Sequence, residues 1–175
     1  MLPSVRMFTV AHHIGGGGKT TRAVYLAAGL ALYGMHVLVV DLDPQGNAST
    51  ALGAEHRSGT PSSYELLLGE CTLEECIQKS TAGEGVFVVP ATIDLAGSEI
   101  ELVSMVAREK RLKDALDDSY LDELGIDFVF IDCPPSLGLL SINAMVAADV
   151  FLLPFPVCST HLTVAPMRLV EMAGG

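Results

Sequence analysis

Basic residues are scarce in this chain. Among 175 residues, lysine and arginine together number 10 while aspartate and glutamate number 21, and the formal net charge is −11. Neutralising nucleic-acid phosphates needs clustered lysine and arginine. The composition therefore argues against a broad DNA-binding surface.

One dense basic group lies between Arg108 and Lys113. Acidic residues accompany it, so that Glu109 precedes Lys113, and Lys110 precedes Asp114, by four positions. Pairs at this spacing stabilise the exposed face of a helix. A solvated helix face explains this group better than a nucleic-acid contact does.

Long apolar runs and paired cysteines are also missing. No apolar run reaches the roughly 18 residues needed to span a bilayer, and the N-terminus lacks the pattern of a secretory signal. No two of the four cysteines form a C-x-x-C pair, which gives a zinc or iron–sulfur site little support. The adjacent His12 and His13 would face opposite sides of a strand and cannot readily bind one metal together. We expect one cytoplasmic domain with reduced thiols.

Short apolar segments alternate with helical patterns along the chain. Residues 5–11, 36–41, 86–90, 126–132 and 150–154 read as buried strands, rich in Val, Ile, Leu or Phe without clean alternation. Helices are predicted over 20–33, 62–68, 73–79, 95–116 and 139–148, with a capping box of Thr72 and Glu75 opening the third. This alternation predicts an α/β fold, a doubly wound, mostly parallel sheet with helices on both faces.

A glycine-rich loop follows the first predicted strand and leads into the first helix. Its residues are Gly15, Gly16, Gly17, Gly18, Lys19, Thr20 and Thr21. Glycines let backbone N–H groups approach phosphate oxygens, and the helix N-terminus adds positive potential. Lysine adds a charge for the outer phosphates, and the Thr20 hydroxyl can ligate magnesium. The segment predicts a P-loop.

The loop departs from the usual pattern G-x-x-x-x-G-K-[ST] at its first position, where this chain has His13. One P-loop subclass does without that glycine and carries a lysine at the next position. Here that position is Ile14.

Two acidic motifs follow later strands, where ligand sites collect in such sheets. Asp41 ends the second predicted strand and Asp43 follows it, in the run D-L-D-P-Q-G-N. This pair of carboxylates could bind magnesium and position water, or the run could be a turn capped by Asp41. Asp132 ends the apolar run F-V-F-I-D, the Walker B pattern, in reach of a magnesium held by the P-loop threonine.

Several blocks together resemble one family. The chain reads V-D-L-D-P-Q-G-N-A-S over 40–49 and D-C-P-P-S-L-G-L-L over 132–140, followed by Asn143-Ala144. Residues 59–65 and 90–97 look like the actinobacterial chromosomal branch. From residue 5 to about residue 154, the chain resembles the ParA/Soj family of chromosome and plasmid partition ATPases.

The resemblance implies a P-loop NTPase that uses ATP or ADP with Mg²⁺. Gly15 to Gly18 and Lys19 would hold the phosphates, and Thr21 would lie at the α-phosphate. Thr20, Asp41 and Asp132 would form the metal site, while Asp43, with Lys19, would be catalytic by positioning the attacking water. Relatives form a homodimer on ATP binding, coat DNA non-specifically and release it after hydrolysis stimulated by a ParB-like partner. They act in the cytoplasm, at the nucleoid.

Departures from the family lead to two readings. The family's signature lysine, which reaches the partner's phosphates across the dimer, is Ile14 here. Losing that cation removes charge stabilisation from phosphoryl transfer. The chain is thus either a partition ATPase of the ParA type, or a nucleotide-binding module with little or no turnover. A membrane-cycling relative of the MinD type is disfavoured, because residues 166–171 are too short and weakly basic for a membrane helix.

The resemblance fades after residue 154. We expect a P-loop ATPase domain over 1–154 and a divergent or irregular tail over 155–175, without the last strands and helices of the family fold or its C-terminal DNA surface. An incomplete sheet would leave an open edge and apolar surface, which predicts self-association.

Overall fold

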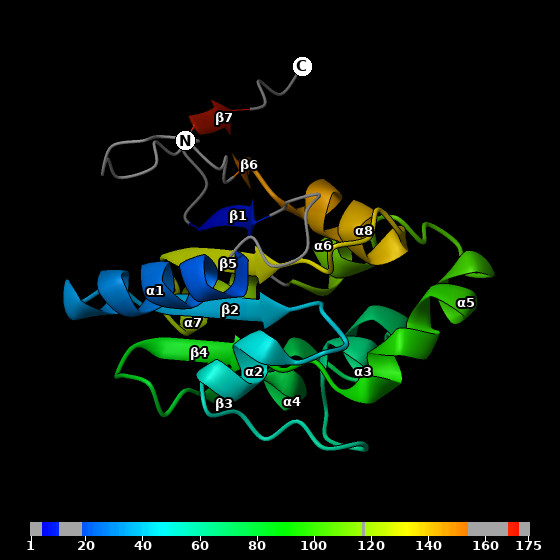
Figure 1. The fold of residues 1–175 in the computed structure, drawn as a ribbon, viewed down its shortest axis with the longest axis horizontal. Coiled ribbons are helices and arrows are strands. Elements are labelled where there is room, and N and C mark those ends of the chain that lie inside the picture. The colour runs from blue at the N-terminus through cyan, green and yellow to red at the C-terminus, as the bar shows by residue number, and fades with distance from the viewer. Residues whose placement is uncertain (1–4, 11–18, 117, 154–167, 172–175) are drawn as a thin grey trace, which may run out of the picture.

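The described residues form a seven-stranded sheet in the order β3-β4-β2-β5-β1-β6-β7, flanked by helices (Figure 1). This computed structural model describes residues 5–10, 19–116, 118–153 and 168–171. The five central strands, β4, β2, β5, β1 and β6, run parallel to one another. The outer strands β3 and β7 pair antiparallel with β4 and β6. The predicted fold class, an α/β sheet that is mostly parallel, is confirmed.

All five predicted strands are present, with ends shifted by at most two residues. The strands are β1 (Arg6–Val10), β2 (Val37–Asp41), β3 (Gln78–Lys79), β4 (Val86–Val89), β5 (Phe128–Asp132), β6 (Val150–Leu153) and β7 (Arg168–Glu171). Strands β3 and β7 were not expected. Strand β7 lies in the segment after residue 154 and pairs antiparallel along β6.

In the described part of the chain, helices lie between most successive strands. They are α1 (Lys19–Leu32), α2 (Asn47–Ala51), α3 (Ser63–Leu68), α4 (Leu73–Cys76), the 3₁₀ helix η1 (Ile93–Gly97), α5 (Ser98–Val103), α6 (Arg111–Ala115), α7 (Asp118–Glu123) and α8 (Leu139–Ala147). The prediction of one continuous helix over 95–116 is wrong, because this range contains the separate helices η1, α5 and α6. Ala107 has φ +52°, a conformation that a continuing helix cannot contain, and it separates α5 from α6.

The third predicted helix is shorter than expected. The capping box of Thr72 and Glu75 opens α4 as predicted, with the Thr72 N–H donating to Glu75 Oε2 at 2.8 Å. The helix ends at Cys76 because Ile77 is extended, and the next two residues form β3. Gln78 and Lys79 therefore pair with β4 instead of completing a helix.

The basic group between Arg108 and Lys113 does not form one helical face. Helix α6 begins at Arg111, so Glu109 lies before it. Arg111 Nε donates to the Leu67 carbonyl at 2.9 Å, and Arg108 donates to the Val103 carbonyl at the same distance. Both guanidinium groups thus make contacts within the domain.

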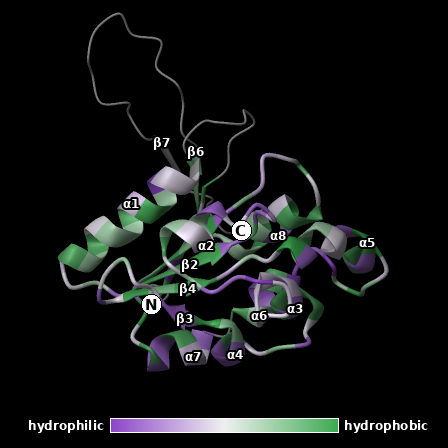
Figure 2. Ribbon diagram, turned by 60° about the horizontal axis from the view of Figure 1, so that its bottom comes forward, coloured by the Kyte–Doolittle hydropathy of each residue, from purple (hydrophilic) through white to green (hydrophobic). Residues whose placement is uncertain are grey.

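Apolar side chains cover both faces of the sheet. All five residues of β2 are buried, and alternate ones face opposite layers. Val37 and Val39 pack in the core beneath α1 and α2, whereas Leu38 and Val40 belong to the larger core beneath α3 and α5 to α8. Figure 2 shows the hydrophobic strands β2 and β4 between α1 and α2 on one side and α3, α6 and α7 on the other.

Candidate functional site

Three parallel strands, β1, β5 and β2, end side by side at the carboxyl-terminal edge of the sheet, where the parallel strands finish. Val10 at the end of β1 is in register with Asp132 of β5, and Asp132 is in register with Asp41 of β2. Asp132 lies two positions after Phe130, and Asp41 two positions after Val39, so both carboxylates are on the sheet face that α1 and α2 cover. The register therefore brings two acidic residues that are far apart in sequence next to the start of α1.

A direct hydrogen bond joins the first of these carboxylates to α1. The Thr20 hydroxyl, in the second residue of the helix, donates to Asp132 Oδ2 at 2.7 Å. Asp132 is 1% exposed, whereas Thr20 is half-buried. A hydroxyl and a carboxylate in contact at a strand end are the oxygen ligands that Mg²⁺ accepts from proteins, alongside water and phosphate. The donor set thus fits magnesium.

The second carboxylate is enclosed by donors of its own loop. Asp41 is fully buried, and its Oδ2 accepts the Ser49 N–H at 2.9 Å and the Ser49 hydroxyl at 2.7 Å. Its Oδ1 accepts the Asp43 N–H at 3.0 Å. Burial raises the pKa of Asp41, and the hydrogen bonds from Ser49 and Asp43 partly offset that effect.

Asp43 lies in a tight turn beyond the end of β2. Its side chain is half-buried, and Oδ1 accepts the Gln45 N–H at 3.0 Å. The Gly46 N–H donates to the Asp43 carbonyl at 2.8 Å, and Gly46 has φ +62°. The turn capped by Asp41, one of the two readings of this motif, is therefore present, and it carries the Asp43 carboxylate at the same edge of the sheet.

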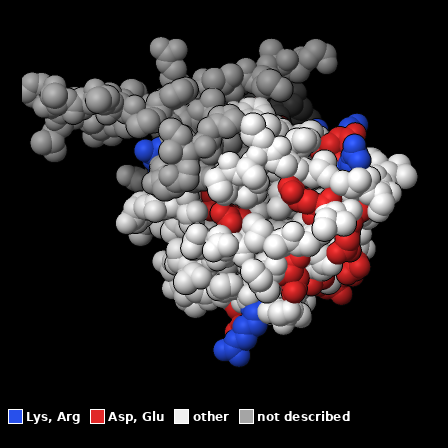
Figure 3. All heavy atoms as spheres, turned by 45° about the vertical axis from the view of Figure 1, so that its right-hand side comes forward, with Lys and Arg blue, Asp and Glu red and all other residues white. Residues whose placement is uncertain are grey.

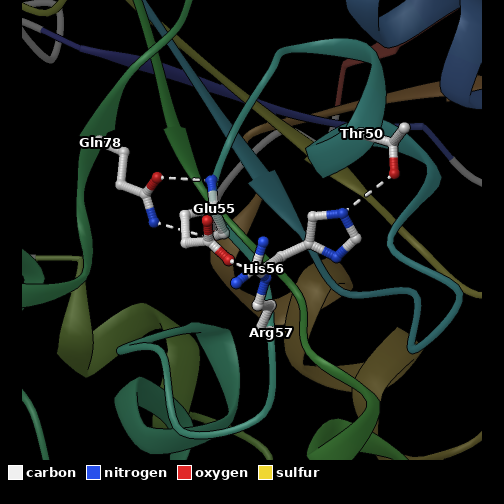
Figure 4. A network of polar contacts seen from close by, with 5 residues as sticks. All are labelled: Thr50, Glu55, His56, Arg57 and Gln78. Atoms are coloured by element: carbon white, nitrogen blue, oxygen red, sulfur yellow. Dashed lines mark hydrogen bonds and ion pairs between the residues drawn. The ribbon is translucent and has the colours of Figure 1, made fainter.

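The segment after α2 supports this turn (Figure 4). His56 Nε2 contacts Thr50 Oγ1 at 3.1 Å, and the Thr50 hydroxyl also lies 3.0 Å from the Gly46 carbonyl. Gln78 of β3 exchanges two hydrogen bonds of 2.9 Å with the backbone of Glu55. A Cβ on residue 46 would lie 3.0 Å from the His56 ring, so the imidazole packs directly against the glycine.

The structure describes only some of the residues predicted to bind phosphate. Gly15 to Gly18 and Ile14 lie outside the described residues, as do His12 and His13. Lys19 is the first residue of α1, and Thr21 is exposed beside Thr20. The structure thus brings together Thr20, Asp41, Asp43 and Asp132, and the phosphate-binding and metal-binding roles of all these residues stay predictions.

Across the described residues, no three His, Cys, Asp or Glu side chains gather in a group that could hold a metal by themselves. A magnesium ion bound here would depend on the Thr20 hydroxyl, water and phosphate oxygens as well as on carboxylate. That is the usual coordination of magnesium at nucleotide sites. In the same described part of the chain, no helix combines the length and apolar character needed to cross a membrane.

Ser49 is a residue at this edge that sequence reasoning missed. It belongs to the D-L-D-P-Q-G-N-A-S block, but serine is common in turns and early helices. A serine eight positions after a strand-end aspartate, across a glycine turn, is the signal that could have indicated the contact.

Comparison with known proteins assigns the family. A family model described as an AAA domain (AAA_31) matches residues 5–163. The sporulation initiation inhibitor protein Soj of Bacillus subtilis is 46% identical over 149 residues, covering 85% of this chain and 57% of that protein. The chromosome partitioning protein ParA of Myxococcus xanthus is also 46% identical over 149 residues, covering 85% and 51% respectively. The chain belongs to the ParA/Soj family. It spans just over half the length of these curated relatives.

Solved structures of other proteins share this ParA/Soj fold. The cobyrinic acid a,c-diamide synthase of Mycobacterium smegmatis, with bound ATP analogue and magnesium, matches with a TM-score of 0.80 and 39% identity, covering 90% of this chain and 63% of its own. An ATP complex of a substituted McdA from Cyanothece matches with a TM-score of 0.74 and 28% identity, covering 86% of this chain and 56% of its own.

Proposed function

We propose that this chain binds magnesium and ATP at the shared ends of β1, β5 and β2 and hydrolyses the nucleotide as a partition ATPase of the ParA type. The observation that carries the proposal is the 2.7 Å hydrogen bond from Thr20 to Asp132. It joins the helix after the glycine-rich loop to the Walker B strand, 112 positions later in the sequence.

Each residue has a distinct part in this proposal. The glycine loop and Lys19 would hold the phosphates, while Thr20, Asp132 and Asp41 would form the magnesium site. When bound, the metal supplies charge neutralisation for the phosphates. The Asp43 carboxylate accepts a hydrogen bond from the attacking water and orients it toward the γ-phosphate.

The wider role follows from the family. In the cytoplasm, ATP would bring two copies together, the dimer would bind DNA, and a ParB-like partner would stimulate hydrolysis. Acidic side chains gather on the right-hand side of Figure 3, the side that carries α5 in Figure 1, in keeping with the net charge of −11. Phosphate contacts need cations, so this acidic face is a poor DNA surface.

A second candidate is a nucleotide-binding module with little or no turnover. The observation that favours it is Ile14, which stands at the signature lysine position of the family. Such a protein would act through nucleotide-dependent contacts with its partners instead of through hydrolysis.

The test measures magnesium-dependent ATP binding and phosphate release, with and without duplex DNA and a ParB-type protein. Lys19→Ala should abolish binding. Asp43→Asn should retain binding but lower phosphate release about 100-fold, because a neutral amide accepts a weaker hydrogen bond from the attacking water than a carboxylate does and can donate to that water instead of orienting it. Asp127→Asn is the matched control: its carboxylate is half-buried and accepts the His36 N–H at 2.8 Å, just before β5 and thus at the opposite ends of the strands.

The outcomes separate the two candidates. Binding with phosphate release that depends on Asp43 supports the ATPase, whereas binding without release under any condition supports the non-hydrolysing module. If the wild-type chain shows no magnesium-dependent ATP binding, both are wrong.

A further inference from the structure

We infer that Ser49 is a positioning residue for the carboxylate of Asp43. The inference rests on the proposed function, in which Asp43 orients the attacking water. Ser49 is fully buried and lies six positions beyond Asp43, in the third residue of α2. It touches neither nucleotide nor water in this scheme and acts through Asp41 and the backbone.

The first step is the closed loop between Asp41 and Ser49. Two hydrogen bonds from Ser49 to Asp41 Oδ2, of 2.9 Å and 2.7 Å, fix the start of α2 against the end of β2. The other oxygen of the same carboxylate accepts the Asp43 N–H at 3.0 Å. The orientation of the Asp41 carboxylate, and with it the backbone of Asp43, therefore depends on Ser49.

The second step is a link to a different strand. The Ser49 hydroxyl accepts the N–H of Ala91 at 2.9 Å, two residues beyond the end of β4. Ala91 is fully buried, so its N–H has no water to bond instead. The hydroxyl thus joins the carboxyl ends of β2 and β4, and it anchors the loop that carries Asp43 to the sheet at a second point.

A serine hydroxyl suits both steps because it donates one hydrogen bond and accepts others. Here it donates to Asp41 and accepts from Ala91. An alanine side chain can do neither: the backbone N–H of residue 49 keeps its bond to Asp41, but the second bond to Asp41 is lost and the buried Ala91 N–H is left without this acceptor. Threonine retains both functions. The remaining contacts of the turn, from Thr50 and His56 to Gly46, do not replace either bond.

The experiment compares Ser49→Ala and Ser49→Thr with the wild-type chain. We expect Ser49→Ala to lower kcat for phosphate release about tenfold or more, since small misplacements of a reacting group are costly, while the Kd for magnesium–ATP changes less than about threefold. Ser49→Thr should restore most of kcat. Ser98→Ala is the control, because Ser98 is equally buried and donates to the Leu95 carbonyl in a different part of the fold.

A second readout needs no turnover and therefore separates this inference from the proposed function. Hydrogen exchange of the backbone amides of Asp43 and Ala91 should accelerate about tenfold or more in Ser49→Ala, relative to the amide of Val39 within β2. That result supports the positioning role even if the wild-type chain releases no phosphate.

Three results would overturn the inference. One is unchanged exchange at Asp43 and Ala91 in Ser49→Ala. Another is acceleration by the same factor at Val39, which would show general destabilisation only. The third is a Ser49→Thr protein that unfolds at the wild-type midpoint but exchanges at these two amides as fast as Ser49→Ala.

Discussion

At the scale of single residues, the Thr20 hydroxyl makes a hydrogen bond between the first turn of α1 and the Walker B strand, β5. Thr20 donates to a carboxylate that is almost fully buried, and hydrogen bonds to charged groups are stronger than neutral ones. Removing the hydroxyl would also leave the proposed magnesium site without one of its protein oxygens. Both effects should be visible separately, because one concerns folding and the other ligand binding.

We predict that Thr20→Val, which keeps the side-chain shape, weakens magnesium-dependent ATP binding about tenfold or more and lowers the free energy of unfolding by about 1–3 kcal/mol. Titrating a fluorescent ATP analogue with and without magnesium gives the first quantity, and urea unfolding gives the second. Thr81→Val, at an exposed threonine before β4, should change neither. Equal magnesium dependence in Thr20→Val and wild type would contradict the assignment of this hydroxyl to the metal.

At the scale of elements, two of the short helices, α3 and α4, are stabilised at their N-termini by side-chain caps. Helix α3 has six residues, too few to be stable alone. Ser62 precedes it and accepts the Tyr64 N–H at 3.2 Å, while its own N–H donates to Glu65 Oε2 at 3.0 Å. The cap matters because α3 packs Leu66 and Leu67 into the larger core.

We predict that Ser62→Ala lowers the free energy of unfolding by about 0.5–2 kcal/mol, the usual cost of losing an N-cap. Ser62 is fully buried, which places the expected value toward the upper end. Thermal or urea unfolding measures it. Ser104→Ala, at an exposed serine that donates to the Glu101 carbonyl, serves as the control and should cost less than about 0.5 kcal/mol. Equal costs for the two variants would show that the cap contributes nothing.

At the scale of the whole molecule, the question is whether two copies complete one hydrolytic site. In the family, a lysine at the position of Ile14 reaches the partner's phosphates, so its charge acts between copies. An isoleucine supplies no cation to the transferring phosphoryl group, where positive charge has a large effect on rate.

We predict that Ile14→Lys raises the rate of ATP hydrolysis about tenfold or more over the wild-type chain, with little change in nucleotide affinity. Phosphate release measured at increasing protein concentration tests it, because a site shared by two copies gains activity with concentration. Ile14→Gln separates charge from length and should remain near wild type. Equal turnover by the wild type and Ile14→Lys would refute the prediction.

The strands were the most predictable part of the fold, and the irregular elements the least. Strand β2 consists of Val37 to Asp41 without a polar interruption before its last residue, and a short run so rich in valine is typical of a strand buried on both faces. Strand β3 could not be foreseen, because Gln78 and Lys79 continue a helical pattern and become a strand only through pairing with β4. The break at Ala107 was hidden for a similar reason, since alanine is a strong helix former whose positive φ no local pattern indicates.

The family and the chemical types at the site could be predicted from the order of residues, because the glycine loop, the D-L-D-P block and the Walker B aspartate are each contiguous in the chain. Which of these residues meet depended on tertiary packing. Parallel register sets Asp41 beside Asp132, and the fold brings Thr20 to Asp132 and Ser49 to Asp41. Hydrogen bonds act over about 3 Å, so only the packed fold can specify them between residues far apart in sequence.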